Sequence, residues 1–593
     1  MKWTWHNKTG EPQTAIPFHL YLNAFSNLDT VFMDDTKGGQ LRGDRRQSDE
    51  EAGFGYCHVI EIKDEAGISL MDGWTVDHDL AELKLPAILE PDQSISLDFY
   101  FESQLPKVFA RSGYADTFHL IGQWFPKPGV FFNGTWNCWN YHGHSEFFAD
   151  FGTYRAELTV PDAYLVGATG VLVDTQKKMD PKTQENLTTY TFEAEDVHDF
   201  AWTADSEFEL AVEDHNGIEI RLLYLKGESQ AGINDQFKAA KATFEWFDEH
   251  VGPYPFSTMT IVQPSFEGIG AAGMEYPTLV TAIPFLTPNP FLAAGAGVTI
   301  HEIGHNYWQG MLASNEFEES WMDEGINSYT EMRIFTEAYG MDMPYKLVDG
   351  LGLTPTMEKR MGYKSAPDVD PMMKRSWEFM SSSSYSINSY SRPAITLMAA
   401  QRLFGIDTMD NLLKDYYDSW SFRHPTTEDF LTVAMNVNPR LEAFLRENLY
   451  TTHTVDLSVK RLESRKRDLG GYPVDERGSI GEFETVSEDI LYTHEVTLFR
   501  KGAQIPPPVD VLFVYEDGTS ERRQWKPDEN AWQRWKWQGE SKLVFAQIDP
   551  DFKLLIDLDF TNNHKNNQED DDARIDSVAS SWLQLIVQSI FPF

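Results

Sequence analysis

The chain has 593 residues, of which 41% are hydrophobic and 24% are charged, a composition that excludes a wholly disordered chain, a collagen and a coiled coil. At about 150 residues per domain, this length corresponds to roughly three to four domains. Because 92 Asp and Glu outnumber 49 Lys and Arg, the net charge is −43, and so acidic a surface argues against nucleic acid and anionic lipid as partners.

The first part of the chain is predicted to form β-sheet. Apolar and polar residues alternate over residues 95–102 and again over residues 154–160, and a period of two is typical of strands with one buried face. Strand patterning continues to about Tyr224, with a polar hairpin loop at residues 175–189. We therefore expect residues 1–205 to form a β-rich N-terminal domain.

Helices are predicted in the middle of the chain. Residues 236–251 carry phenylalanine and alanine side chains at helical spacing, which indicates one buried helix face. Two further helices are expected over residues 291–309 and 319–339, and helical patterns dominate through Leu449. These elements predict a second, α-rich domain over residues 206–450.

Strand patterning returns near the end of the chain. Residues 451–480 read as a linker, and strands are expected again over residues 490–560. Residues 481–593 are predicted as a β-rich C-terminal domain that ends in a helix around the apolar stretch Trp582–Val587. The β regions lie too far apart in sequence for alternating βα units, so the chain is predicted to be a multidomain α+β protein.

Cysteine content and hydropathy narrow the class of protein further. Cys57 and Cys138 are too few for a disulfide framework or a cysteine-based metal site; a single bridge stays open, with core packing preferred. No apolar run reaches the roughly 18 residues of a membrane-spanning helix, so no transmembrane segment is expected. Residues 1–6 lack the sections of a signal peptide. A soluble protein is expected, with its compartment and oligomeric state left open.

The most informative segment is His301-Glu302-Ile303-Gly304-His305. On a helix, positions i and i+4 share one face, so both imidazoles can hold one metal ion. Glu302 can reach a water bound to that ion. Zinc lowers the pKa of such a water to about 7 and polarises a carbonyl oxygen, and both effects serve amide hydrolysis. The structural alternative is a packed helix without metal, but polar side chains in so apolar a helix need partners.

A catalytic zinc site needs a third protein ligand. Glu324 follows His305 after the eighteen residues 306–323, enough for a turn and an antiparallel return of the chain. Glu331 lies two helical turns beyond Glu324, on the same face. We therefore expect Glu324 as the third ligand and Glu331 as the carboxylate that holds the free ring nitrogen of a ligand histidine.

With this spacing the chain resembles the gluzincin zinc metallopeptidases of the aminopeptidase N and leukotriene hydrolase type. Residues 272–276, Ala-Gly-Met-Glu-Tyr, resemble the Gly-Ala-Met-Glu-Asn exopeptidase motif of that family. Residues 390–394, Tyr-Ser-Arg-Pro-Ala, resemble its Tyr-Glu-Lys-Gly-Ala segment. The resemblance runs from about Trp3 to Asn563. It implies a β-sheet N-domain, a thermolysin-like α-rich catalytic domain and a β-sandwich-like C-terminal domain.

The resemblance also implies a role for individual residues. The zinc ligands are His301, His305 and Glu324, one zinc per chain, and the general base is Glu302. Tyr390 is the expected hydrogen-bond donor to the developing oxyanion, with Tyr385 as its rival. The residues expected to contact the substrate, with Glu275 binding its α-ammonium, are Gly273, Met274 and Glu275.

The sequence departs from the family pattern in three places. Tyr276 stands where the family has Asn, which leaves the side-chain preference of the substrate open. Arg392 and Pro393 replace Lys-Gly, with Pro393 expected near a helix start, where proline is tolerated. Finally, Met1 falls almost at an early strand of the N-domain, whereas the family normally has strands before it, so an N-domain without its first strands is one interpretation.

The function implied is that of a zinc-dependent aminopeptidase acting on peptides with a free N-terminus. One alternative is a zinc peptidase of other specificity or a bifunctional hydrolase. The other is a catalytically silent scaffold with this fold; silent relatives typically lose ligands or the base, and here all are present. The preferred N-terminal residue and the physiological substrate stay open.

Overall fold

The computed structural model describes residues 1–36, 40–41, 45–46, 53–108, 110–283, 294–340, 345–348, 351–466, 470–484, 492–502, 507–527 and 530–567. The chain forms two compact units. The first is built from Met1–Glu358, Met373–Tyr390 and Asp410–Val433. The second is built from Lys359–Met372, Ser391–Met409 and Ala434–Phe593.

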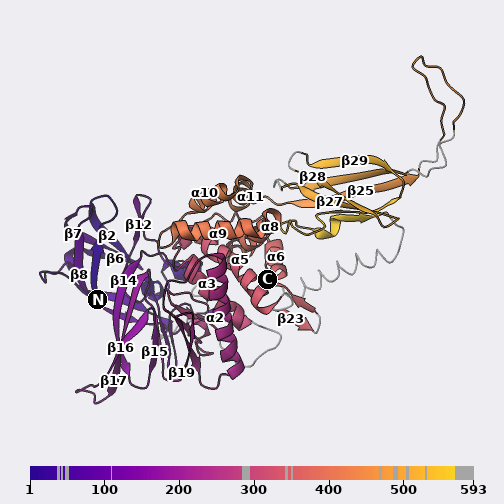
Figure 1. The fold of residues 1–593 in the computed structure, drawn as a ribbon. Helices are drawn as coiled ribbons and strands as arrows, with labels where there is room; N and C mark the ends of the chain where they lie inside the picture. Colours follow the sequence, from indigo (N-terminus) through magenta and orange to yellow (C-terminus); the bar gives the residue numbers. More distant parts are fainter. Residues whose placement is uncertain are drawn as a thin grey trace. The chain divides into compact units, whose positions relative to one another are not determined.

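The N-terminal part of the first unit is made of antiparallel sheets, as the alternating pattern predicts (Figure 1). In the central strand of one sheet, Leu97 and Phe99 are buried, whereas Tyr100 on the opposite face is exposed. That sheet has the order β1 (Lys2–His6), β8 (Ser94–Gln104), β5 (Tyr56–Asp64). A second sheet has the order β11 (Lys127–Pro128), β2 (Gln13–His19), β7 (Leu80–Leu89), β6 (Trp74–Asp77).

Further small sheets complete this region. One has the order β15 (Leu165–Ala168), β18 (Trp202–Asp205), β10 (Phe118–Ile121), β9 (Gly113–Ala115). Another has the order β14 (Gly152–Pro161), β17 (Asn186–Val197), β16 (Val171–Met179). Short pairs are formed by β12 (Val130–Phe132) with β13 (Thr135–Asn137) and by β3 (Gln40–Leu41) with β4 (Arg45–Arg46). The short helix α1 covers Val31–Asp35.

A mixed sheet and three longer helices follow. The sheet has the order β19 (Phe208–His215), β20 (Ile218–Leu225), β21 (Thr258–Val262), β22 (Leu279–Thr281), and its last two pairings are parallel. The longer helices are α2 (Gln230–His250), α3 (Ala294–Trp308) and α5 (Ile326–Tyr339). Helices α2 and α3 lie side by side in Figure 1, and α5 contacts both. Between α3 and α5 the chain forms α4 (Glu316–Glu319) and one π-helical turn, η5 (Trp321–Gly325).

The predicted helical region continues to Tyr450. Its later elements are β23 (Tyr345–Val348), β24 (Leu351–Leu353), α6 (Pro355–Ser365), α7 (Ser382–Ser386), the π-helical turn η7 (Ile387–Ser391), α8 (Arg392–Phe404), α9 (Ile406–Trp420), α10 (Thr427–Val437) and α11 (Pro439–Tyr450). Pro393 lies in the first turn of α8, directly after the π-helical turn η7.

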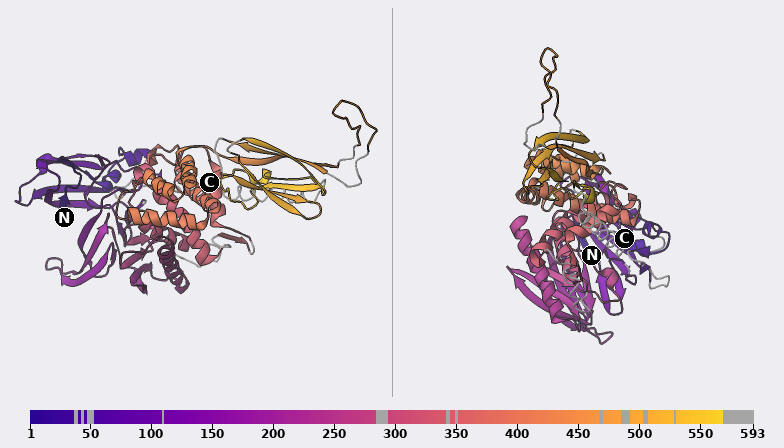
Figure 2. Two further views of the ribbon diagram at one scale, coloured as in Figure 1. Left: turned by 45° about the horizontal axis from the view of Figure 1, so that its top comes forward. Right: turned by 90° about the vertical axis from the view of Figure 1, so that its right-hand side faces the viewer.

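The C-terminal strands form two sheets that face each other, coloured orange to yellow in Figure 2. Phe513 of one sheet lies against Trp535 and Trp537 of the other. The first sheet has the order β25 (Asp456–Lys466), β26 (Tyr492–Lys501), β29 (Trp532–Gly539). The second has the order β28 (Ser520–Trp525), β27 (Val509–Tyr515), β30 (Leu543–Ile548), β31 (His564–Asn566).

Strand β25 differs from the sequence expectations, and two predicted helices lie partly or wholly outside the described residues. The second predicted helix is described from Ala294 onward, because residues 284–293 lie outside the described residues. Strand β25 occupies part of the segment 451–480 that reads as a linker, because Leu457, Val459 and Leu462 are buried between its polar and basic residues. The predicted terminal helix at Trp582–Val587 lies outside the described residues.

Two of the remaining expectations concern thiols and membranes. Cys57 and Cys138 are both free, and Cys57 is buried in the N-terminal core. No helix among the described residues combines the length and the apolar character that a membrane span requires.

Candidate active site

Helix α3 places the His-Glu-x-x-His residues against α5. Ile300 and Ile303 are buried and anchor the apolar face of α3. Gly304 lies so close to α5 that a Cβ atom there would overlap the side-chain oxygen of Asn327. Asn327 Nδ2 donates a hydrogen bond to the carbonyl oxygen of His301 at 2.8 Å. The absence of a side chain at Gly304 therefore allows the close approach of the two helices.

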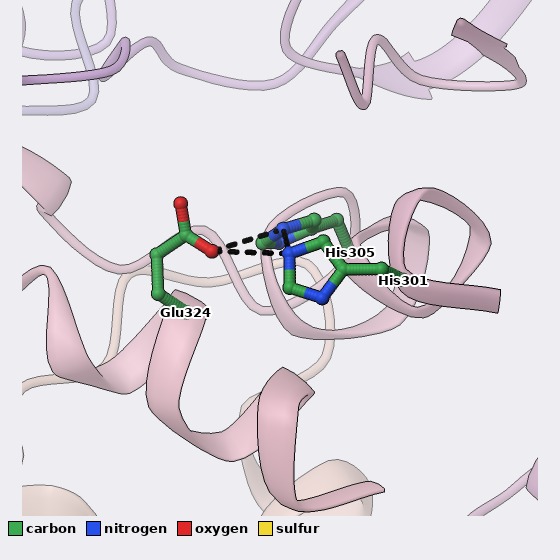
Figure 3. A group of neighbouring side chains, drawn as sticks. All are labelled: His301, His305 and Glu324. Atoms are coloured by element: carbon green, nitrogen blue, oxygen red, sulfur yellow. Dashed lines mark hydrogen bonds and ion pairs between the residues drawn. The ribbon is translucent and has the colours of Figure 1, made fainter. Parts of the chain in front are cut away.

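The three predicted ligands converge on one point (Figure 3). His301 Nε2 and His305 Nε2 lie 3.0 Å apart, and each lies 3.3 Å from Glu324 Oε2. Figure 3 shows the carboxylate of Glu324 facing both imidazole rings. Glu324 reaches this point from the π-helical turn η5, and its side chain is 5% exposed.

This group fits a zinc ion in its donor set. Two imidazole nitrogens and one carboxylate oxygen are typical of catalytic zinc sites, and ligands about 2.0–2.2 Å from a tetrahedral ion stand about 3.3–3.6 Å from one another. The observed separations of 3.0 and 3.3 Å are close to that spacing. His301, His305 and Glu324 are therefore the residues that would hold the metal.

Carboxylates also face the other nitrogen of each imidazole. Glu331 Oε2 lies 3.2 Å from His301 Nδ1, the position in which the sequence expects it. Asp323 Oδ1 lies 2.5 Å from His305 Nδ1 and was not expected from the sequence. Such partners fix the ring orientation and raise the basicity of the ligand nitrogen. The only sequence signal for Asp323 is its place directly before Glu324.

Glu302 is buried beside the ligand group. Its side chain belongs to the same helix turn as His301, and burial raises its pKa to about 7, opposed by the positive charges of His301 and His305. Gly273 lies beside it, because a Cβ built on Gly273 would stand 3.6 Å from Glu302 Oε1. The base predicted from the motif and the predicted substrate loop are thus neighbours in space.

The predicted substrate loop runs along the edge of the mixed sheet. Gly273 N donates to Thr281 O and Thr281 N donates to Met274 O, both at 2.8 Å, so the loop pairs with the end of β22. Gly273 has φ of +70°, a conformation that favours glycine. Arg111 Nη1 donates to Gly273 O at 3.3 Å, and its guanidinium forms a buried ion pair with Glu146. No motif or spacing in the sequence predicts this link from Arg111 to the loop.

The two candidate tyrosines differ in what they contact. The hydroxyl of Tyr390 donates a hydrogen bond to Glu324 Oε1, and its ring stacks on that of His301 at a centroid distance of 6.1 Å. Tyr385 is buried with its ring 6.3 Å from that of Tyr390. The phenol in contact with the ligand group is therefore that of Tyr390.

A second group of acidic side chains lies next to the ligand group. Glu275, Glu316 and Asp323 each place a carboxylate oxygen within 4.8 Å of the other two. Burial raises the pKa of Glu316 well above its usual range, and the negative charge of Asp323 raises it further. Sequence reasoning missed Glu316, because it lies in a run of acidic residues at 316–319 that reads as a solvated helix face.

Tyr276 does not line an open surface. It is 3% exposed in the N-terminal core, and a Cβ atom on Gly122 would overlap its hydroxyl group. We therefore expect Gly122→Ala to destabilise the protein by about 1–3 kcal/mol, the usual effect of overpacking a core. Tyr276→Phe is the control: its hydroxyl is buried and accepts no hydrogen bond from the described residues, so its loss should leave the melting temperature unchanged or raised. Equal melting temperatures for Gly122→Ala and wild type would contradict this packing.

Comparison with known proteins identifies a protein family whose domain is similar to the segment that carries this site. Residues 236–447 match the Peptidase family M1 domain. Aminopeptidase B from Mus musculus is 26% identical over 234 residues, which cover 36% of this chain and 32% of that protein. Leukotriene A-4 hydrolase from Xenopus laevis is 28% identical over 204 residues, which cover 33% of this chain and 32% of that protein. The matching segments thus span about a third of these relatives.

Solved structures share the fold over a larger part of the chain. The M1 zinc metallopeptidase from Deinococcus radiodurans aligns with a TM-score of 0.53 at 17% identity, covering 76% of this chain and 88% of that chain. Aminopeptidase A from Legionella pneumophila, solved in complex with aspartic acid, aligns with a TM-score of 0.59 at 13% identity. The alignment covers 84% of this chain and 54% of that chain. Residues 236–447, which carry the His301, His305 and Glu324 group, are therefore similar to the Peptidase family M1 domain and show distant homology to aminopeptidase B and leukotriene A-4 hydrolase.

Proposed function

We propose that the protein is a zinc-dependent aminopeptidase that hydrolyses the N-terminal peptide bond of peptides. The observation that carries this proposal is the convergence of His301, His305 and Glu324 beside the buried carboxylate of Glu302. The M1 family match and the distant similarity to aminopeptidase B support it.

The chain's own residues supply the groups that the reaction needs. When bound, zinc supplies an activated water of pKa about 7 and polarises the substrate carbonyl. Glu302 takes a proton from the attacking water and gives it to the leaving amine. The hydroxyl of Tyr390 donates a hydrogen bond to the carbonyl oxygen as negative charge develops there. Asp323 and Glu331 hold the imidazoles of His305 and His301 in place.

Glu275 makes the proposed enzyme an exopeptidase. Its loop pairs with the end of β22 next to Gly273, which itself lies beside Glu302. A carboxylate in such a site accepts charge-assisted hydrogen bonds from the free α-ammonium of the substrate. This contact fixes the end of the peptide, so only the first peptide bond reaches Glu302.

We expect the wild-type protein to cleave peptides with a free N-terminus and nearly to spare the same peptides after N-acetylation. An acetylated N-terminus has no positive charge and leaves the partly buried Glu275 without its partner, so the charge-assisted hydrogen bond to the substrate is lost. Glu275→Ala should lose most activity on free peptides and narrow the difference between the two substrates. Rates are measured on the two peptides by product chromatography.

Two results separate the parts of this proposal. Comparable cleavage of free and acetylated peptides by the wild type contradicts the aminopeptidase assignment but leaves a zinc peptidase of other specificity. Full zinc content without hydrolysis of any peptide favours a catalytically silent scaffold.

A further inference from the structure

The acidic pocket formed by Glu275, Glu316 and Asp323 holds more negative charge than the proposed reaction requires. Asp323 Oδ1 already accepts a hydrogen bond from His305, and Glu275 belongs to the predicted substrate loop. Glu316, on the short helix α4, has no part in the proposed reaction. Its carboxylate nevertheless comes within 4.8 Å of the other two.

Glu316 is buried without compensation. Its side chain is 1% exposed, and both of its carboxylate oxygens lack a hydrogen-bond partner among the described residues. The same holds for Asp323 Oδ2. Nor does any ion pair formed by the described residues include Glu316, although neighbouring Glu318 and Arg375 form one at 3.1 Å. Buried carboxyl groups are unfavourable in their charged form unless a cation pairs with them, and three of them around one point match a cationic ligand.

The arrangement of the three carboxylates favours an ammonium group over a metal ion. Calcium takes six to eight oxygen ligands and magnesium keeps several waters, whereas two of the three carboxylates here are fully buried. A primary ammonium has three N–H donors and no acceptor, which matches three carboxylates around one point. Glu275 is only partly buried, whereas Glu316 and Asp323 are the buried members.

We propose that Glu316 is a specificity-determining residue that, with Glu275 and Asp323, binds all three N–H groups of the substrate's primary α-ammonium. The pocket therefore selects peptides whose N-terminal amine is primary. An N-methylated residue has a secondary ammonium with only two N–H donors, which leaves one carboxylate unpaired. This inference rests on the proposed aminopeptidase function and names the class of amine that it accepts.

The kinetic test compares alanine p-nitroanilide with N-methylalanine p-nitroanilide. Wild-type protein should prefer the primary amine by about tenfold or more, the usual effect of one hydrogen bond to a charged group. Glu316→Gln should lose about tenfold in kcat/KM on the primary amine, mainly through KM, and its preference should narrow. Glu318→Gln is the matched control on the same helix and should behave as wild type.

A merely structural role of Glu316 predicts a different result. In that case Glu316→Gln would lower the melting temperature and reduce kcat/KM equally for both substrates. That result would overturn the proposal. We expect instead that Glu316→Gln keeps its zinc content and its melting temperature, because glutamine has nearly the same size and both replaced oxygens lack a hydrogen-bond partner among the described residues. Unchanged kcat/KM and unchanged preference in Glu316→Gln and Glu316→Leu would also overturn it.

A binding measurement tests whether the three carboxylates bind the ammonium group without requiring turnover. In the Glu302→Gln background, calorimetry with alanine amide should show about tenfold weaker binding after Glu316→Gln, and no binding of N-acetylalanine amide. If wild-type protein hydrolyses neither anilide, the proposed function fails, while this titration still tests the pocket. A titration with magnesium or calcium chloride completes the design: one bound divalent ion that Glu316→Gln loses would overturn the ammonium site.

Discussion

Replacing His301 by alanine is expected to abolish both stoichiometric zinc and peptidase activity. The substitution removes one of three ligand atoms that lie 3.0–3.3 Å from one another and leaves only His305 and Glu324. A catalytic zinc site needs three protein ligands. Wild-type protein should carry one zinc per chain by elemental analysis, and the His301→Ala protein should carry almost none.

A second variant, Glu331→Gln, separates the loss of a zinc ligand from the loss of the carboxylate that orients a ligand. Glu331→Gln keeps all three ligands and changes only the group that faces His301 Nδ1, so we expect zinc affinity to fall by roughly 10- to 100-fold. A chelator should stop the activity of wild-type protein, and added zinc should restore it. Full zinc content in His301→Ala protein would show that the ion binds elsewhere.

Removing the base should stop the reaction while the metal stays. Glu302→Gln preserves the size of a buried side chain that contributes no atom to the ligand group. Because the amide cannot accept the proton of the attacking water, kcat should fall by about 10²-fold or more. Zinc content, measured on the same sample, should equal that of wild type. An active Glu302→Gln protein would exclude Glu302 as the base.

The phenol is tested in the same assay. Tyr390→Phe removes only the hydroxyl that contacts Glu324, and we expect it to retain zinc and to lose about 10²-fold in kcat, as removal of an oxyanion donor does. Tyr385→Phe is its matched control, since the two rings are 6.3 Å apart. A fully active Tyr390→Phe beside an inactive Tyr385→Phe would transfer the role to Tyr385.

Much of the architecture follows from patterns in the sequence. Period-two alternation predicts the N- and C-terminal sheets because each strand has one buried face, as Leu97 and Phe99 of β8 show. Likewise, the i, i+4 spacing of His301 and His305 places both imidazoles on one helix face, and the structure shows them 3.0 Å apart. These are local rules, and they depend only on neighbours along the chain.

The rest of the site depends on contacts that local rules cannot supply. Glu324 lies in a π-helical turn, whose wider spacing changes which neighbouring side chains share a direction, so the contact of Asp323 with His305 is not predicted by an α-helical wheel. Glu316 faces the pocket because α4 is buried at its first residue, which its acidic sequence conceals. The contact from Arg111 to Gly273 joins segments far apart in the sequence.

The contacts that Arg111 and Gly122 make link the N-terminal sheets to the segment that matches the peptidase domain. Arg111 reaches across to the carbonyl oxygen of Gly273, and Gly122 leaves the space that Tyr276 fills. Residues 236–447, the segment that matches the family model, therefore do not by themselves supply all the contacts of the predicted substrate loop. A side chain at position 122 would require a smaller residue than tyrosine at position 276, so the two positions constrain each other's size. Grafting this segment onto another N-terminal domain would require a designer to rebuild both contacts.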